Sequence, residues 1–294
     1  NFIAFNGDVA RDLAAQFLAL AEKQRATIPL LVGHRLVGPS SLITGDIVDG
    51  RAHYDQALAL YDAAEHRSLA TRFGYDIRVS ILSFRSVALW MLGYPEAALL
   101  DADQALKDAR ETGHAPSLMF ALAGTSVTHL LLRNYATANA RADELVAVAD
   151  EKSAPFWKAW GRTIQGCVLA LTGKSSGAIQ QIIAAITAFQ LTGATWGLPT
   201  WLVHLAKAYA DLRQFEDAWR CIDEAILAVE KAKERWWEAE VNRIAGEIAL
   251  KSPAPDSAKA YFERAVTVAR TQQTKSWELR AATSMARLWR DQGK

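Results

Sequence analysis

The 294-residue sequence predicts an all-α fold in which helix–turn–helix repeats stack into a solenoid. The first observation is a column of small residues that recurs at a constant interval along the chain, apart from one longer step: Ala10, Gly50, Ala98, Ala138, Ala178, Ala218 and Ala258. The second is an equally regular column of small residues in the first helices of the hairpins, whereas the column above lies in the second helices. Its members are Gly38, Ser86, Ser126, Gly166, Ala206, Gly246 and Ala286. Small side chains are needed where two helices cross closely, so the two columns indicate about seven stacked hairpins in one register.

The register then fixes each element in turn. Pro29 in a first turn and Gly45 after a last turn bound one helix, and Gly93 and Pro95 separate the next pair. Residues 66–74 contain the eight-residue excess of the longer step, so we expect a longer loop there. Each hairpin has a first helix and a second helix. The sequence predicts an unpaired second helix over 6–24 and an unpaired first helix over 275–291. Between them it predicts the hairpins 28–44 with 46–65, 75–92 with 95–111, 116–132 with 135–152, 154–172 with 175–191, 196–212 with 215–233 and 235–250 with 256–272.

The pattern begins with a second helix and ends with a first helix. We therefore expect residues 1–294 to be a single repeat domain taken from a longer protein. The alternative is that these end helices are atypical caps, which solenoids carry at their ends.

The stretch 202–225, LVHLAKAYADLRQFEDAWRCIDEA, resembles the tetratricopeptide (TPR) unit, with its L-x-x-L-A-x-x-Y and A-x-x-x-I-x-x-A spacing. The repeat period of 40 residues exceeds the usual period of about 34 residues in that family. In this respect the sequence resembles the long-helix variants in sensor regions of bacterial signal-transducing ATPases and MalT-type regulators. The C-terminal stretch SWELRAATSMARLWRDQGK looks like the repeat region of proteins that also carry an adenylate cyclase. The resemblance implies a right-handed superhelix and a non-catalytic interaction and sensor scaffold, the regulatory region of a bacterial signalling protein. The alternative is a stand-alone TPR adaptor that binds a peptide or protein.

Composition excludes several other classes of function. The net charge of +1 gives no electrostatic case for nucleic acid or an anionic membrane. Residues 175–206 carry no charge, but Gly193 and Pro199 would interrupt a spanning helix. Two isolated cysteines, Cys167 and Cys221, favour a reducing compartment, so we expect a cytoplasmic protein.

No motif assigns catalysis, a cofactor or a metal. Gly173-Lys174-Ser175 matches the end of a P-loop, but Val168 stands where that motif needs its first glycine. The histidines show no metal-ligand spacing. An enzyme on this scaffold would need polar clusters that cross repeats.

The first helices of TPR arrays line the concave surface, which predicts a groove that runs from apolar to charged. Arg78 and Arg85 lie seven residues apart on one helix, where they could hold a carboxylate or phosphate, or pair with Asp76 or Asp101. The candidate groove residues are Arg78, Arg85, Trp90, Phe120, Trp160, Lys207 and Arg243.

Two further apolar features stand out. Trp157, Trp237 and Trp277 share one position of the repeat, with Trp196 one residue off, and are either a structural column or an aromatic ladder for a ligand. The uncharged helix 175–191 offers Ile179, Ile183, Ile186 and Phe189, a candidate face for self-association into a homodimer or for docking other domains of the parent chain. The expected partner is thus a protein or peptide.

Overall fold

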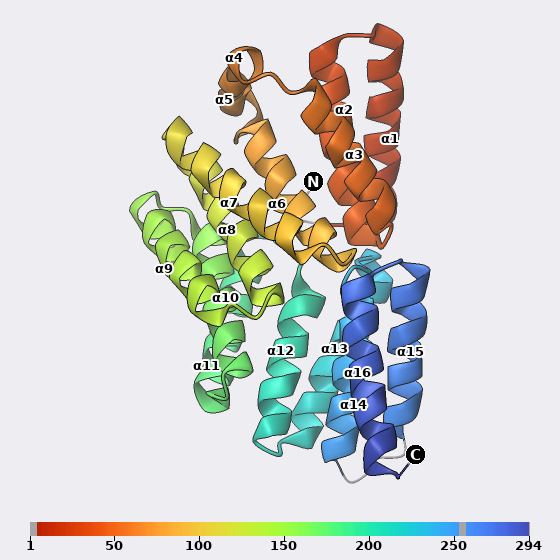
Figure 1. The fold of residues 1–294 in the computed structure, drawn as a ribbon. Coiled ribbons are helices and arrows are strands. Elements are labelled where there is room, and N and C mark those ends of the chain that lie inside the picture. Colours follow the sequence, from red (N-terminus) through yellow and green to blue (C-terminus); the bar gives the residue numbers. More distant parts are fainter. Residues whose placement is uncertain (1–4, 253–256, 294) are drawn as a thin grey trace.

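The computed structural model describes residues 5–252 and 257–293, and within these ranges every regular element is a helix (Figure 1). Antiparallel pairs follow one another along the chain and pack on their neighbours. The pairs are α2 (Thr27–Thr44) with α3 (Ile47–Leu60), α6 (Ile77–Met91) with α7 (Pro95–Thr112), α8 (Ala115–Leu131) with α9 (Tyr135–Glu151), α10 (Pro155–Leu171) with α11 (Ser175–Leu191), α12 (Leu198–Asp211) with α13 (Phe215–Ala232) and α14 (Glu238–Lys251) with α15 (Ala258–Thr271). Helix α1 (Gly7–Gln24) packs on α2, and α16 (Lys275–Asp291) packs on α15. The predicted all-α solenoid of helical hairpins is confirmed.

The small-residue columns lie at the helix crossings. Ala98, Ala138, Ala178, Ala218 and Ala258 have no exposed surface. Glycines of the first-helix column face large side chains of the second helix. A Cβ built on Gly166 would lie 2.6 Å from the Ile182 side chain, and one on Gly246 would lie 2.5 Å from the Phe262 ring. The columns are thus small because backbone and side chain are in direct contact there.

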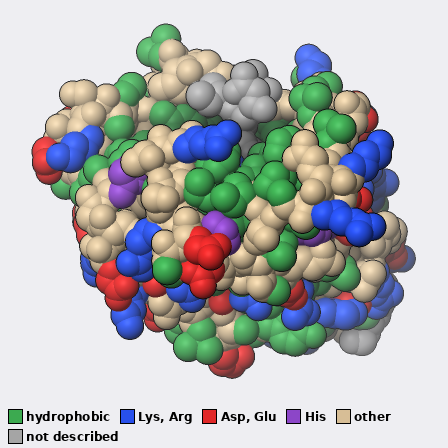
Figure 2. Space-filling model, turned by 90° about the horizontal axis from the view of Figure 1, so that it is seen from above, with side chains coloured by type: hydrophobic (Ala, Val, Ile, Leu, Met, Phe, Trp, Pro, Cys, Tyr) green, Lys and Arg blue, Asp and Glu red, His purple; other side chains and the backbone are tan. Residues whose placement is uncertain are grey.

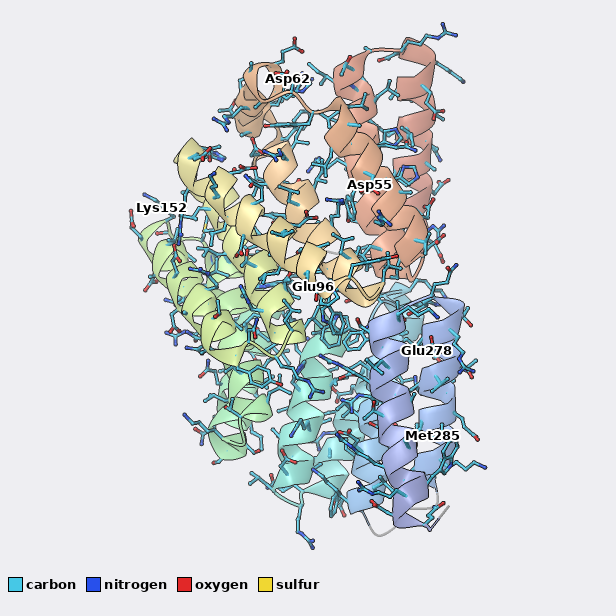
Figure 3. All side chains as sticks on the ribbon, viewed as in Figure 1. Asp55, Asp62, Glu96, Lys152, Glu278 and Met285 are labelled. Atoms are coloured by element: carbon cyan, nitrogen blue, oxygen red, sulfur yellow. The ribbon has the colours of Figure 1, made fainter. Side chains whose placement is uncertain are left out.

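Residues 66–74 do not form the longer loop that the register predicts. They belong to short helical turns, α4 (Ala63–His66), the 3₁₀ turn η1 (Arg67–Leu69) and α5 (Ala70–Phe73). Helix α3 ends at Leu60 rather than Glu65, because Asp62 starts a new turn (Figure 3). Its carboxylate accepts hydrogen bonds from the backbone N–H groups of Ala64 and Glu65, at 2.7 and 3.2 Å.

The later helix starts also differ from prediction. Helices α12 and α14 begin at Leu198 and Glu238 rather than at 196 and 235. Gly197 precedes α12 with a φ of 81°, a left-handed backbone that interrupts the helix. The predicted start at 256 lies outside the described residues.

The superhelix curves until its two ends meet (Figure 1). The backbone N–H groups of Arg235 and Trp236, before α14, both donate to the carbonyl oxygen of Ile43 at the end of α2, at 2.8 and 3.2 Å. On α16, Ser276 donates to the carbonyl oxygen of Trp90. The rings of Trp90 and Trp277 pack edge to face, with centroids 4.7 Å apart. The concave side is therefore an enclosed interior rather than an open groove along the whole array.

Arg280 on α16 makes several contacts at this closure. Its guanidinium carbon lies beside the two packed rings, 4.7 Å from the centroid of Trp90 and 5.0 Å from that of Trp277. It also donates to the carbonyl oxygen of Leu131 at the end of α8, at 2.6 Å. One side chain thus ties the last helix to two hairpins from the first half of the chain.

Candidate ligand-binding cavity

A cavity of about 380 Å³ lies in the interior of the superhelix, beside α6, α8 and α10. Figure 2 looks onto this end of the molecule, where hydrophobic side chains gather around a central hollow. Most of the lining is aromatic or small and apolar. The lining residues are Gly74, Tyr75, Ser83, Phe84, Val87, Pro116, Phe120, Ala123, Gly124, Val127, Phe156, Trp157, Trp160, Trp196 and Trp236. A concave, mostly apolar cavity of this size fits a small ligand or the side chains of a bound segment.

The aromatic lining is continuous across four repeats. The ring of Phe120 packs on Tyr75, with centroids 4.6 Å apart, and on Trp157 at 5.7 Å. Farther along, Trp160 packs on Trp196 at 4.7 Å. Tyr75 and Trp157 are partly exposed, whereas Trp160 and Trp196 are 5% and 8% exposed. The rings thus form a partly exposed rim and a buried floor.

The floor carries indole N–H groups that have no acceptor. Within the described residues, the Nε1 atoms of Trp160 and Trp196 are buried and unpaired. Buried polar groups are ordinarily hydrogen-bonded, so two unpaired donors in the wall of one cavity call for an explanation.

Trp236 differs, because its Nε1 donates to Glu234 at 2.8 Å. The Glu234 carboxylate is fully buried and also accepts from the backbone N–H of Gly197, at 2.9 Å for the closer oxygen. Burial raises the pKa of Glu234 to about 7, although both hydrogen bonds oppose the shift. This carboxyl group holds the α13–α14 turn against the α11–α12 turn.

The tryptophan column divides between core and cavity. Trp237 and Trp277 are 2% and 1% exposed, and their rings pack on each other with centroids 5.1 Å apart, so they are part of the core. Trp157 and Trp196 line the cavity. Trp237 and Trp277 are thus structural, whereas a ligand-binding role of Trp157 and Trp196 stays a prediction.

Two of the predicted groove residues, Phe120 and Trp160, line the cavity. Trp90 does not, because it is buried at the closure against Trp277. Lys207 donates to Asp211 at 2.6 Å, and Arg243 is paired with Glu240 and Glu247. The structure thus brings Phe120 and Trp160 together and leaves Trp90 and the charged residues of the predicted set elsewhere.

Arg78 and Arg85 are held by carboxylates, the second of the two possibilities that the sequence left open. Arg85 lies between Asp101 on α7, at 2.9 Å, and Asp55 on α3, at 2.7 Å (Figure 3). Arg78 pairs with Asp108 at 2.9 Å rather than with Asp76. Asp76 is occupied as the cap of α6, where it accepts from the backbone N–H of Val79. A role of either arginine in binding stays a prediction.

The predicted self-association face on α11 is narrower than the sequence suggests. Ile183 is 43% exposed, and Ile179 and Ile186 are half-buried against the core. Phe189 is 3% exposed and packs on Phe156, with centroids 5.0 Å apart, directly behind the cavity. Self-association through this face also stays a prediction.

Sequence reasoning missed Tyr75, Phe84, Phe156 and Trp236. One signal was present: Phe156, Trp196 and Trp236 occupy the same position in three successive repeats and form a second aromatic column, beside the one that contains Trp237. All three of these residues line the cavity, whereas in the column that contains Trp237 only Trp157 does, and Trp237 and Trp277 lie in the core.

The described residues show neither a helix that is apolar and long enough to span a membrane nor a group of three or more side chains suited to a metal ion.

No known protein family and no curated protein matches the sequence. Solved structures do match the fold. A Rap protein complexed with the Competence and Sporulation Factor has a TM-score of 0.63 at 11% identity, over 95% of this chain and 79% of that one. The Rap conjugation gene regulator of plasmid pLS20, in complex with the Phr* peptide, has a TM-score of 0.61 at 11% identity, over 92% and 77%. A tetratricopeptide repeat protein from Parabacteroides merdae has a TM-score of 0.50 at 15% identity, over 92% and 91%.

At these identities the likeness shows the fold alone. The fold is a TPR-type helical repeat, as the sequence predicts. The resemblance to the repeat regions of cyclase-linked and MalT-like proteins stays a prediction.

Proposed function

We propose that the chain is a non-catalytic regulatory module that binds an apolar segment of a peptide or protein partner in its interior cavity. The observation that carries the proposal is the cavity itself, an aromatic-lined space of about 380 Å³ that several successive helical repeats enclose. Aromatic side chains supply large contact areas and dominate the energetics of peptide and protein recognition. Two solved structures with the same fold, at 11% identity, are described as complexes with a factor or a peptide, which supports this class of ligand.

The ligand would insert one or two large apolar side chains between the rim and the floor. Full burial of one such side chain contributes about 1.5–3 kcal/mol to the free energy of binding. Two buried side chains therefore give micromolar binding only if the ligand backbone also makes contacts. An extended segment satisfies both needs.

The test is a selection of peptides from a random displayed library on the native chain. We expect the selected peptides to share an aromatic or large aliphatic residue. Their binding should be lost in Ala123→Phe, because Ala123 is 4% exposed and lines the cavity, so that a phenyl ring there fills the space.

The matched control is Ala188→Phe, the same substitution at an exposed position on α11, outside the cavity. It should leave binding unchanged, and thermal melting shows whether each variant is folded. Peptides that bind both variants as well as the native chain would place the site elsewhere, and failure to select any peptide would refute peptide binding.

We further propose that this module is the regulatory repeat region of a cytoplasmic bacterial signalling protein with a cyclase or NTPase domain. The resemblance of the 202–225 unit and the C-terminal stretch to such proteins supports this context. The alternative is a stand-alone adaptor. The sequence of the full-length gene decides between them, because only the first requires a catalytic domain in the same chain.

A further inference from the structure

Arg35 on α2 is a half-buried arginine beside the cavity. Its guanidinium carbon lies 5.3 Å from the ring centroid of Tyr75, which lines the cavity, and 5.8 Å from that of Phe73. Among the described residues, its Nε is buried without a hydrogen-bond partner, and no carboxylate forms an ion pair with it. Other arginines that are partly or largely buried, such as Arg85 and Arg243, are each held by two carboxylates. A positive charge therefore stands at the rim without a counter-ion in the described chain.

Other groups around the cavity add to this excess of donors. The hydroxyl of Tyr54 is fully buried and has no partner among the described residues. Its ring stacks on Phe84, which lines the cavity, with centroids 6.4 Å apart. The indole N–H groups of Trp160 and Trp196 are unpaired at the floor. The Tyr54 hydroxyl and both indole N–H groups are covered by neighbouring atoms, so the half-buried Arg35 side chain supplies the charge that a ligand with a carboxylate would complement.

We infer that the segment bound in the cavity carries a carboxylate next to its apolar side chain, and that Arg35 binds this carboxylate. The inference rests on the proposed function. The apolar side chain lies against the rings of Phe84, Phe120 and Trp160, and the carboxylate remains at the rim, where the guanidinium stands on Tyr75. An arginine offers paired donors with the geometry of a carboxylate, so the contact fixes the orientation of the segment as well as its charge. The carboxylate has two possible sources, a free C terminus after the apolar residue or an acidic side chain before it.

Three short peptides test the inference and distinguish the sources. The first is acetyl-Ala-Ala-Ala-Phe with a free C terminus, the second is the same peptide as its C-terminal amide, and the third is acetyl-Ala-Asp-Phe-Ala amide. Isothermal titration calorimetry measures the affinity of each for the native chain. A charge-assisted hydrogen bond contributes about 1.5–3 kcal/mol, so we expect one or both carboxylate peptides to bind about ten-fold or more tighter than the amide.

Arg35→Gln should remove this preference by weakening only the carboxylate peptides. Arg72→Gln is the matched control, because Arg72 is also next to the Phe73 ring, at 5.5 Å, but is exposed. It should leave all three affinities unchanged. Arg35→Lys keeps the charge and should keep part of the preference, which tests the inference if Arg35→Gln does not fold.

The outcomes separate the inference from the proposed function. Equal binding of the amide and both carboxylate peptides to the native chain overturns the inference and leaves the cavity as a site for apolar segments. A preference that persists in Arg35→Gln also overturns it. Binding of none of the three peptides, together with a failed peptide selection, refutes the proposed function itself.

Discussion

The sharpest test of the packing is Gly246→Ala, because a single methyl group at this position would overlap with a neighbouring side chain. A Cβ at Gly246 on α14 would lie 2.5, 2.6 and 3.0 Å from three carbon atoms of the Phe262 ring on α15. Phe262 has no exposed surface, so its ring cannot move without moving the helix. Overpacking of this kind costs about 1–3 kcal/mol, and the better helix propensity of alanine returns about 1 kcal/mol. The free energy of unfolding should therefore fall by up to about 2 kcal/mol.

The matched control is Gly177→Ala on α11, an exposed glycine for which the nearest atom to a new Cβ is the Leu169 side chain at 3.8 Å. The same substitution should stabilise the protein there by about 0.5–1 kcal/mol. At about 2 °C per kcal/mol for a chain of this size, the melting temperatures of the two variants should differ by about 1–6 °C, with the native protein between them.

A double-mutant cycle assigns the cause. In a Phe262→Ala background, Gly246→Ala should lose its penalty, because the ring that the methyl group meets is gone. Differential scanning calorimetry or thermal melting by circular dichroism provides the measurement. If Gly246→Ala raises the melting temperature as Gly177→Ala does, the close contact between α14 and α15 does not exist and the explanation of the small columns is wrong.

Three further predictions concern closure, pH and assembly. Arg280→Met should lower the free energy of unfolding by about 1.5–3 kcal/mol and increase the radius of gyration in small-angle scattering, because the hydrogen bond to the Leu131 carbonyl oxygen is lost. The control is Arg290→Met, at an exposed site where the arginine pairs with its neighbour Asp291, and it should change neither quantity. Since burial raises the pKa of Glu234 to about 7, the native state holds more protons than the unfolded state between about pH 4.5 and 7, so this group destabilises the fold as the pH rises through that range, by up to about 3 kcal/mol. Glu234→Gln should remove that slope from a plot of melting temperature against pH, and an identical slope in the variant would contradict the assignment. If α11 mediates self-association, Ile183→Lys should abolish any concentration-dependent dimer in sedimentation equilibrium without lowering the melting temperature, since Ile183 is 43% exposed.

The local part of the fold is predictable from sequence because each helix crossing uses the same positions. Gly166 and Gly246 are small because Ile182 and Phe262 lie against their backbones, and the two pairs have the same separation along the chain. Closure of the superhelix is different. The contact between Ser276 and Trp90 joins residues 186 positions apart, and it depends on small rotations that accumulate over all the repeats between them. No column in the sequence records that sum.

The same reasoning explains which site residues could be found. Phe120 and Trp160 were found because the register identifies the inner face of a first helix. The partner of Arg78 was not, since the sequence points to Asp76 or Asp101, whereas Asp76 caps α6 and the carboxylate that pairs with Arg78 is that of Asp108 on α7. Arg35 was missed because the feature that distinguishes it is the absence of a counter-ion among the described residues. A sequence shows which charges are present, but it does not show that a half-buried guanidinium has no counter-ion among the residues described.

The cavity exists because of the small residues on α8 rather than the large ones around it. Ala123 and Gly124 stand on the inner face of α8, where α6 and α10 contribute rings. A Cβ on Gly124 would lie 2.6 Å from the Ser83 side chain, so α6 and α8 approach each other as closely as their backbones allow. That approach brings Phe84 and Phe120 into contact, with centroids 5.7 Å apart, while Ala123 leaves the space beside them unfilled. Substitutions of increasing size at position 123 should therefore fill the cavity and exclude ligands in order of their own bulk before they affect the melting temperature.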